Sequence, residues 1–175
     1  MSNIILIGFM GAGKTTAGLR LAKELGVSLI DTDQRIEEEQ QRSINDIFAA
    51  EGEAYFRGLE TQQLKKLMQQ EQAVISVGGG LPVQRVNHPL LKQLGQTIYL
   101  KAQKETLVKR LQGSTTRPLL KGGQLEEKIA SLMEAREAVY EEVADIIVET
   151  DDKNLNEVVE AIKEQIGSFR RKEIK

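Results

Sequence analysis

The chain has 175 residues, of which 40% are hydrophobic and 4% aromatic, and its 24 basic and 26 acidic residues give a net charge of −2. The length suits one α/β domain with an aliphatic core. The near-neutral charge argues against a nucleic-acid or membrane surface, and the few aromatic rings argue against stacking on single-stranded bases. The lack of cysteine excludes disulfides and thiolate nucleophiles, and the single histidine, His88, excludes a cluster of histidine ligands. We interpret His88, which precedes a proline, as part of a helix start.

No apolar stretch approaches the ~20 residues that a membrane-spanning helix needs. The N-terminus leads directly into an expected strand, without the pattern of a signal peptide. We therefore expect a cytoplasmic protein. An organelle location after removal of a transit peptide remains an alternative at this stage.

The first expected elements enclose a phosphate-binding motif. Residues 3–7 are an apolar run typical of a buried strand, and residues 14–25 have helical periodicity that ends at Gly26. Between them, residues 8–15 read G-x-x-x-x-G-K-T, in the strand-to-helix context that supports this motif. Glycine backbone N–H groups can form a nest for phosphate at the start of the helix. Lys14 would then reach the β- and γ-phosphates of a nucleotide, and the Thr15 hydroxyl would hold Mg²⁺.

The remaining elements alternate between strands and helices. This alternation predicts a single α/β domain of three layers, in which helices cover both faces of a five-stranded parallel sheet. The segment 112–123 lacks periodicity and is rich in glycine, so we expect a mobile loop there, and the basic tail 170–175 should be frayed. The further strands are expected at 27–30, 73–77, 97–100 and 145–149, and the further helices at 34–41, 44–51, 53–70, 89–94, 105–111, 124–143 and 154–169.

Three of the expected strands end in unusual residues: the phosphate loop, Asp31 and Asp33, and the triple glycine at 78–80. Because ligands of such sheets gather at the carboxyl ends of the strands, we expect these three segments at one edge. Asp31 and Asp33 point in different directions along an extended segment, so one could face Mg²⁺ and the other an acceptor substrate. The alternative for Asp33 is a simple helix cap.

Other candidates have equally ordinary alternatives. Arg57 could bind a carboxylate in a fork while Glu60 holds it, or the two could form a surface ion pair of ~0.2–0.5 kcal/mol. The triple glycine suggests close approach of the backbone to a ligand, or else a flexible turn. Arg117, in the expected mobile loop, could stabilise a transferring phosphoryl group or be solvated, and Arg136 could be a surface charge on a long helix.

Taken together, these residues resemble the shikimate kinase family over essentially the whole chain. The resemblance rests on an ordered set that is far more specific than any one member: the residues 11–16, Asp31 to Asp33, Phe48 with Gly52 and Glu53, Phe56 and Arg57, Glu60, Gly78 to Gly80, residues 117–120, and Arg136 with Tyr140. The resemblance favours a functional role over the ordinary alternative for three arginines, Arg57, Arg117 and Arg136.

The resemblance implies a P-loop kinase fold with strand order 2-3-1-4-5, an acceptor-binding helical region at about 32–60 and a mobile lid at about 112–123. It implies a monomer that transfers the γ-phosphate of ATP to the 3-hydroxyl of shikimate, with Mg²⁺. The implied catalytic residues are Lys14, Asp33 and Arg117. The nucleotide would be bound by Gly11, Ala12, Gly13, Lys14, Thr15, Thr16, Arg110 and Arg117, with Arg110 stacked on adenine. Shikimate would be bound by Asp33, Arg57, Gly78, Gly79, Gly80 and Arg136, and Mg²⁺ by Thr15 and, through water, Asp31.

One segment departs from the family pattern. Such kinases often carry Arg-x-Pro near the adenine after the last strand, and residues 152–156 here contain neither arginine nor proline. Adenine contacts in that segment are therefore in doubt. A kinase for another polyol, such as gluconate, and a non-catalytic nucleotide or shikimate sensor are the competing functions. A GTPase is disfavoured because the chain has no Asn-Lys-x-Asp motif.

Overall fold

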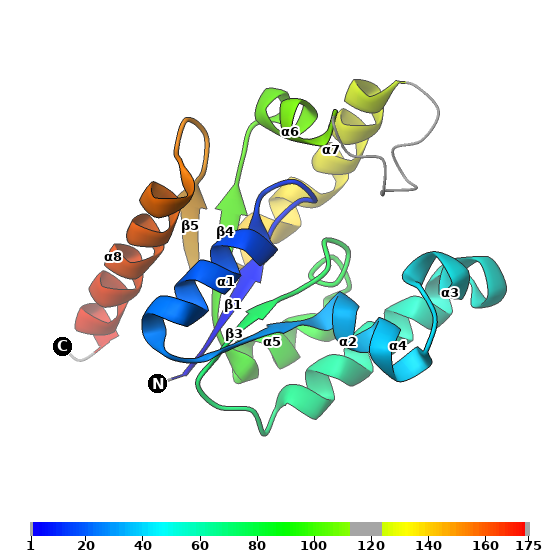
Figure 1. Ribbon diagram of the computed structural model, residues 1–175, viewed down its shortest axis with the longest axis horizontal. Coiled ribbons are helices and arrows are strands. Elements are labelled where there is room, and N and C mark those ends of the chain that lie inside the picture. Colours follow the sequence, from blue (N-terminus) through cyan, green and yellow to red (C-terminus); the bar gives the residue numbers. More distant parts are fainter. Residues whose placement is uncertain (1, 113–123, 174–175) are drawn as a thin grey trace.

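The computed structural model describes residues 2–112 and 124–173, without the side chains of residues 170 and 173. The expected lid, including Arg117, therefore lies outside the described residues except for its first position. The described strands form one parallel sheet in the order β2-β3-β1-β4-β5, which confirms the expected fold class (Figure 1). The strands are β1 (Asn3–Ile7), β2 (Ser28–Asp31), β3 (Ala73–Ser76), β4 (Gly95–Lys101) and β5 (Ile146–Glu149).

Strand β1 lies at the centre of the sheet because its residues are apolar on both faces. Ile4 to Ile7 are each at most 1% exposed, as expected for a strand that helices cover from both sides. In register, Ile5 lies beside Ile75 of β3 and Thr97 of β4. This position places the phosphate loop, which follows β1, in the middle of the carboxyl edge of the sheet.

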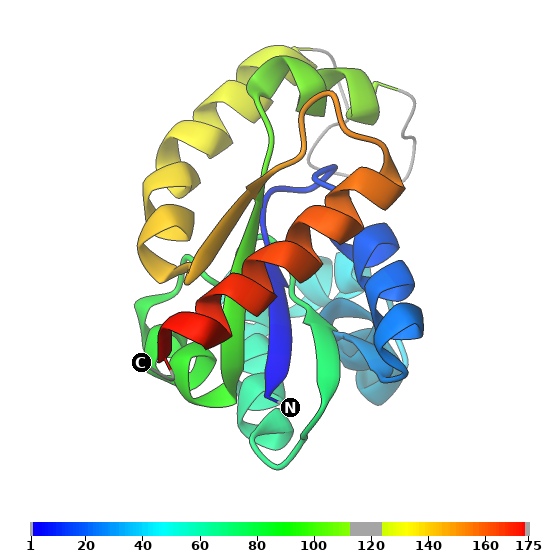
Figure 2. The same ribbon diagram turned by 90° about the vertical axis from the view of Figure 1, so that its left-hand side faces the viewer.

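Helices cover both faces of the sheet, as the alternating pattern predicts. Helices α1 and α8 contact each other on one face, and Figure 2 shows α8 crossing in front of the strands. Helices α5 and α7 contact β4 from the other face. The helices are α1 (Lys14–Leu25), α2 (Thr32–Gln40), α3 (Ile44–Glu51), α4 (Glu53–Leu67), the 3₁₀ helix η1 (Arg85–Asn87), α5 (His88–Leu94), α6 (Lys104–Leu111), α7 (Leu125–Val143) and α8 (Leu155–Glu173). Among the described residues, no helix is both long and apolar enough to cross a bilayer.

Helices α2, α3 and α4 stand beside the sheet at its β2 edge (Figure 1). They have a small hydrophobic core of their own, made by Ile36, Ile47 and Phe56, each at most 4% exposed. This group of helices includes residues 32–60, where the acceptor-binding region is expected, and that assignment stays a prediction.

The structure differs from the expected elements mainly at their ends. Strand β4 begins at Gly95 rather than at 97, because Gly95 both ends α5 and pairs in register with Asn3. A Cβ at Gly95 would overlap the carbonyl oxygen of Asn3, so only glycine permits this close pairing. Helix α8 continues to Glu173, beyond the expected end at 169. The short helix η1 was not expected, because three residues are too few to show a periodic pattern of apolar side chains.

Asn3 ties the amino-terminal ends of the strands together. Its buried amide nitrogen donates to the carbonyls of Gln70 at 2.6 Å and Leu94 at 2.9 Å, and its amide oxygen accepts from Ala73 N–H at 3.0 Å. One side chain thus provides hydrogen bonds to backbone groups at or just before the start of β3 and of β4.

We predict that Asn3→Ala lowers the free energy of unfolding by about 2–4 kcal/mol, because buried backbone groups left without a partner cost ~1–3 kcal/mol each. Urea denaturation measures this change. The matched control is Asn156→Ala on the exposed side of α8, which should change stability by no more than ~0.5 kcal/mol. Equal effects of the two substitutions would contradict the role given to Asn3.

Candidate functional site

The phosphate loop has the backbone conformation that its sequence predicts. Gly11 and Gly13 have φ values of 83° and 88°, in the left-handed region that favours glycine, and Gly13 precedes the first residue of α1. The ammonium group of Lys14 lies back over the loop, where it donates to the carbonyls of Gly8 at 2.8 Å and Phe9 at 3.2 Å. The start of α1 and this lysine therefore provide positive charge at the same point, which suits a phosphate group.

Asp31 joins the phosphate loop to helix α2. Its Oδ1 accepts from the N–H groups of Asp33 at 3.0 Å and Gln34 at 3.2 Å, and its Oδ2 accepts from the Thr15 hydroxyl at 3.3 Å. The capping residue of α2 is thus Asp31, so the interpretation of Asp33 as a cap is wrong. Strand β3 separates β2 from β1, but the common carboxyl edge still brings Asp31 to the phosphate loop.

Asp33 lies in the first turn of α2 with one oxygen unsatisfied. Its Oδ1 is buried and has no hydrogen-bond partner among the described residues. Burial, and next the charge of Asp31, raise the pKa of the Asp33 carboxyl to about 6. An unpartnered buried carboxylate oxygen is costly, so its presence indicates a position that a hydrogen-bond donor of a ligand would fill.

Arg57, which is half-buried, and the buried Glu60 form an ion pair on α4. Arg57 Nη1 lies 2.7 Å from Glu60 Oε1, and Glu53 Oε1 accepts from Nη2 at 3.2 Å and from Nε at 3.3 Å. The Glu60 side chain is only 1% exposed, so the interpretation as a surface pair is wrong. Burial raises the pKa of Glu60 to about 7 although Arg57 opposes this shift, and the second oxygen, Oε2, has no partner within the described chain.

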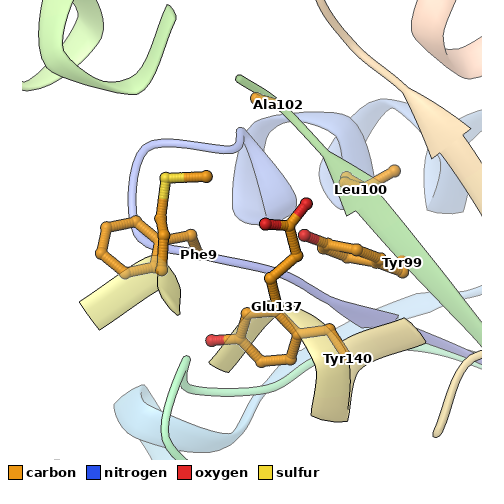
Figure 3. Close-up of a pocket in the computed structure, with 7 residues that line it drawn as sticks. Phe9, Tyr99, Leu100, Ala102, Glu137 and Tyr140 are labelled. Carbon is orange, nitrogen blue, oxygen red and sulfur yellow. The ribbon is translucent and has the colours of Figure 1, made fainter. Parts of the chain in front are cut away.

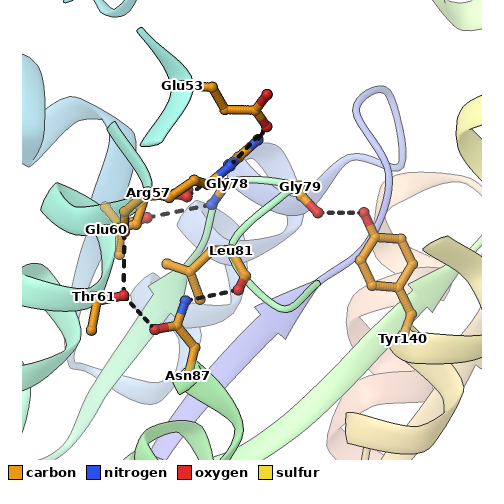
Figure 4. A network of polar contacts seen from close by, with 10 residues as sticks. Glu53, Arg57, Glu60, Thr61, Gly78, Gly79, Leu81, Asn87 and Tyr140 are labelled. Atoms are coloured by element: carbon orange, nitrogen blue, oxygen red, sulfur yellow. Dashed lines mark hydrogen bonds and ion pairs between the residues drawn. The ribbon is translucent and has the colours of Figure 1, made fainter. Parts of the chain in front are cut away.

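The triple glycine forms a turn that is crowded by side chains. A Cβ at Gly78 would lie 2.7 Å from Asp33 Oδ1 and 3.1 Å from Glu60 Oε2, and one at Gly80 would overlap the Arg57 guanidinium. Tyr140 donates its hydroxyl to the carbonyl of Gly79 at 2.5 Å (Figure 4). The glycines are therefore required by close packing rather than by flexibility. In the described chain, the N–H groups of Gly79 and Gly80 have no hydrogen-bond partner.

Helix α7 closes the site from the side of β4. Arg136 Nη1 would lie 3.3 Å from a Cβ at Gly79, and the guanidinium carbon lies 6.0 Å from the centre of the Phe9 ring. The buried ring of Tyr140 packs on Tyr99, with 5.2 Å between the ring centres. Figure 3 shows the small pocket that Phe9, these two rings and Glu137 line. Arg136 therefore faces the glycine turn and the phosphate loop and is not a surface charge.

One cleft of about 480 Å³ connects these groups, and its size is typical of a small-molecule site. It brings together the candidate residues from the phosphate loop, β2, α2, α4, the glycine turn and α7. Ala12 and Arg110 do not line it, and Arg117 lies outside the described residues. The lining residues include Met10, Gly11, Gly13, Lys14, Thr15, Thr16, Asp31, Asp33, Ile44, Phe48, Phe56, Arg57, Glu60, Ser76, Val77, Gly78, Gly79, Gly80 and Arg136.

Arg110 links the phosphate loop to the segment after β5. It donates to the carbonyl of Gly11 at 3.2 Å and to the hydroxyl and carbonyl of Thr150 at 3.4 Å and 3.3 Å. Nearby, Asp151 accepts from the N–H of Gln103, the residue before α6, at 3.0 Å, so the segment after β5 is also tied to the start of α6. Stacking of Arg110 on adenine stays a prediction.

The oxygens near Lys14 suit Mg²⁺ bound jointly with phosphate. The hydroxyl of Thr15 and the carboxylate of Asp31 lie side by side at the cleft, and both are the hard oxygen ligands that Mg²⁺ prefers. In the described part of the chain, no group of three His, Cys, Asp or Glu side chains forms an all-protein metal site. A metal held by Thr15 and Asp31 would take its other ligands from phosphates and water.

Comparison with known proteins gives consistent matches to one family. The family model described as "Shikimate kinase" matches residues 10–167. The shikimate kinase of Chlorobium chlorochromatii is 44% identical over 97% of this chain and 93% of its own length, and that of Bacillus mycoides is 40% identical over 95% and 99%.

Solved structures agree with this result. The shikimate kinase from Acinetobacter baumannii, determined in complex with shikimate, is 38% identical, with a TM-score of 0.90 over 96% of this chain and 94% of its own. A gluconokinase from Sinorhizobium meliloti covers 91% of this chain and 87% of its own with a TM-score of 0.59, but at 17% identity it shares the fold alone.

The raised pKa of Asp33 predicts how stability depends on pH. Aspartate titrates near 3.9 in an unfolded chain and Asp33 near 6 in the native one, so the native state binds this proton more tightly. The contribution of Asp33 to stability is therefore complete below about pH 3.9 and is lost as the pH rises through about 6. We predict that Asp33→Asn raises the free energy of unfolding by roughly 2 kcal/mol above about pH 7 and changes it little near pH 4, as measured by urea denaturation.

The matched control is Asp46→Asn, which removes an exposed carboxylate from the first turn of α3. It should lower stability by up to ~0.5 kcal/mol, because a negative charge favours the start of a helix. A pH-independent effect of Asp33→Asn would show that its carboxylate is not strained by burial.

Proposed function

The chain belongs to the shikimate kinase family, and we propose that it transfers the γ-phosphate of ATP to the 3-hydroxyl of shikimate. The observation that carries this proposal is the convergence of Asp33, Arg57 and Arg136 on one cleft beside the phosphate loop. These residues come from three separate elements, and a kinase fold alone would not require them together. We also propose that it acts as a monomer.

The acceptor side of the cleft is complementary to a small hydroxylated carboxylate. We assign the carboxylate of shikimate to Arg57 and Arg136, since guanidinium groups bind carboxylates through charge-assisted hydrogen bonds. Its hydroxyls are assigned to Asp33, whose Oδ1 lacks a partner among the described residues. The N–H groups of Gly79 and Gly80 supply further donors, and Ile44, Phe48 and Phe56 give an apolar wall for the ring.

The nucleotide side is assigned to the phosphate loop. Lys14 would exchange its contacts with the Gly8 and Phe9 carbonyls for the phosphates, and residues 11–16 would surround them. Thr15 and, through water, Asp31 would hold Mg²⁺, which supplies positive charge to the phosphates. The resemblance to the family assigns Arg117 to the transferring phosphoryl group and Arg110 to adenine.

The raised pKa of Asp33 suits a general base. In the proposed step, the 3-hydroxyl oxygen forms a bond to the γ-phosphorus, the bond from that phosphorus to the bridging oxygen of ADP breaks, and Asp33 takes the hydroxyl proton. A carboxyl with a pKa of about 6 is mostly ionised at neutral pH and binds a proton more readily than an exposed aspartate. Lys14 and Arg117 would stabilise the charge on the phosphoryl oxygens during transfer.

An assay of ADP release distinguishes this function from its competitors. The protein is supplied with ATP, Mg²⁺ and, separately, shikimate, gluconate and other hydroxy acids. The proposal requires turnover with shikimate at a kcat/KM far above that for gluconate. Preference for gluconate would instead support the polyol kinase, and nucleotide binding without turnover would support a sensor.

We predict that Lys14→Ala nearly abolishes turnover while the fold persists, because Lys14 supplies charge to the phosphates at the moment of transfer. Steady-state kinetics measure the loss. The control is Lys23→Ala, an exposed lysine in the last turn of the same helix, which should leave kcat and both KM values unchanged. Full activity of Lys14→Ala would reject the assignment of the loop.

We predict that Arg57→Ala raises the KM for shikimate by about 10- to 150-fold, which corresponds to ~1.5–3 kcal/mol for hydrogen bonds to a charged group. The KM for ATP should change little. Arg57→Lys keeps the charge but loses the planar fork, so it should recover only part of the affinity. If only ATP binding suffered, Arg57 would belong to the nucleotide side.

A further inference from the structure

A buried polar relay connects the helix that carries Arg57 to the glycine turn. The hydroxyl of Thr61, one helical turn after Arg57 on α4, donates to Asn87 Oδ1 at 2.7 Å. The other end of the same side chain, Asn87 Nδ2, donates to the carbonyl of Leu81 at 2.9 Å (Figure 4). Leu81 directly follows Gly80, so the relay runs from one side of the Arg57–Gly80 contact to the other.

The orientation of the Asn87 amide is fixed by its two partners. The side chain is fully buried, and a reversed amide would place its oxygen against the carbonyl of Leu81. Because an unsatisfied buried amide is costly, the two neighbouring elements must keep the spacing at which both hydrogen bonds form. Asn87 therefore acts as a spacer of fixed length between α4 and the turn.

Two other hydrogen bonds hold the rest of the turn, and neither of them comes from α4. The Thr32 hydroxyl accepts from Gly78 N–H at 3.3 Å, and Tyr140 holds the carbonyl of Gly79. Those contacts come from α2 and α7, whereas Arg57 lies on α4. The spacing matters because the Arg57 guanidinium packs directly on Gly80, where a Cβ would overlap it.

We propose that Thr61 and Asn87 are positioning residues that set the distance between Arg57 and the glycine turn, and thereby the affinity for the acceptor carboxylate. Neither residue lines the cleft, so neither touches the acceptor. They act through Arg57 on one side and through the N–H groups of Gly79 and Gly80 on the other. This inference rests on the proposed function, because it assigns the carboxylate to those groups.

The first test is the KM for shikimate in two nearly isosteric variants. Thr61→Val removes the donor to Asn87 and should raise this KM by about 3- to 10-fold, whereas Asn87→Leu removes both ends of the relay and should raise it by about 10- to 100-fold. In both variants kcat and the KM for ATP should stay within about twofold of the wild type, because the phosphate loop is unaffected. Thr61→Ser keeps the hydroxyl and should restore the wild-type KM.

Thermodynamic cycles separate positioning from a general loss of stability. In the Asn87→Leu background, Thr61→Val should cause little further rise in the KM for shikimate, because the relay is already broken. In the Arg57→Ala background it should also cause little further rise, because the guanidinium that the relay positions is absent. If Asn87→Leu does not fold, the pair Thr61→Val and Arg57→Ala completes the test. Additive effects in the Arg57→Ala background would overturn the proposal.

Gln63→Met provides the matched control. Gln63 is another buried polar residue of α4, but its amide donates to Glu39 on α2 at 2.7 Å and not toward the glycine turn. It should lower the melting temperature without changing the KM for shikimate. An unchanged KM in Thr61→Val, or an equal rise in Gln63→Met, would reject the inference alone. A wild-type protein without shikimate turnover would reject the proposed function and this inference with it.

Discussion

The side of the cleft that we assign to the acceptor depends on the ion pair between Arg57 and Glu60. One oxygen of Glu60 binds Arg57, while the other lies against Gly78 on the same side as the unpartnered oxygen of Asp33. Arg57 in turn packs on Gly80, where a Cβ would overlap its guanidinium. A Cβ at Gly78 would displace the carboxylates of Asp33 and Glu60, and one at Gly80 would displace the Arg57 guanidinium. The ion pair and the glycine turn therefore have to be considered as one unit.

The buried carboxylates of this arrangement lower the stability of the fold but leave hydrogen-bond acceptors for a ligand. Asp33 and Glu60 both hold a buried oxygen without a partner among the described residues, and burial raises the pKa of both. Sites of this kind lower stability and are tolerated because ligands satisfy them. The stability comes from elsewhere, chiefly from the aliphatic residues of β1 and its neighbours, which the cleft does not disturb.

The sequence was sufficient for the parts of the structure that depend on local patterns. The buried run of β1, the phosphate loop and the ends of α1 follow from apolar spacing and glycine. The position of Arg57 does not, because an i, i+3 pair with Glu60 has the same sequence whether it is exposed or buried. The family resemblance supplied that step and the strand order. Thr61 and Asn87 were missed because each is ordinary in its own segment, and their contact joins residues far apart in the chain.

The dual role of Asp31 constrains the length of the chain between β2 and α2. A single carboxylate both caps α2 and accepts from Thr15, so the nucleotide loop and the helix that bears Asp33 share one point of attachment. An insertion or deletion between the end of β2 and the first turn of α2 would break this attachment. We expect changes in chain length to be tolerated instead where α2 meets α3, or where α4 meets β3, because those junctions lie away from the shared carboxylate. New acceptor specificities within this architecture would therefore arise by exchanging the helices beyond α2 while the short link from residue 31 to residue 33 stays the same.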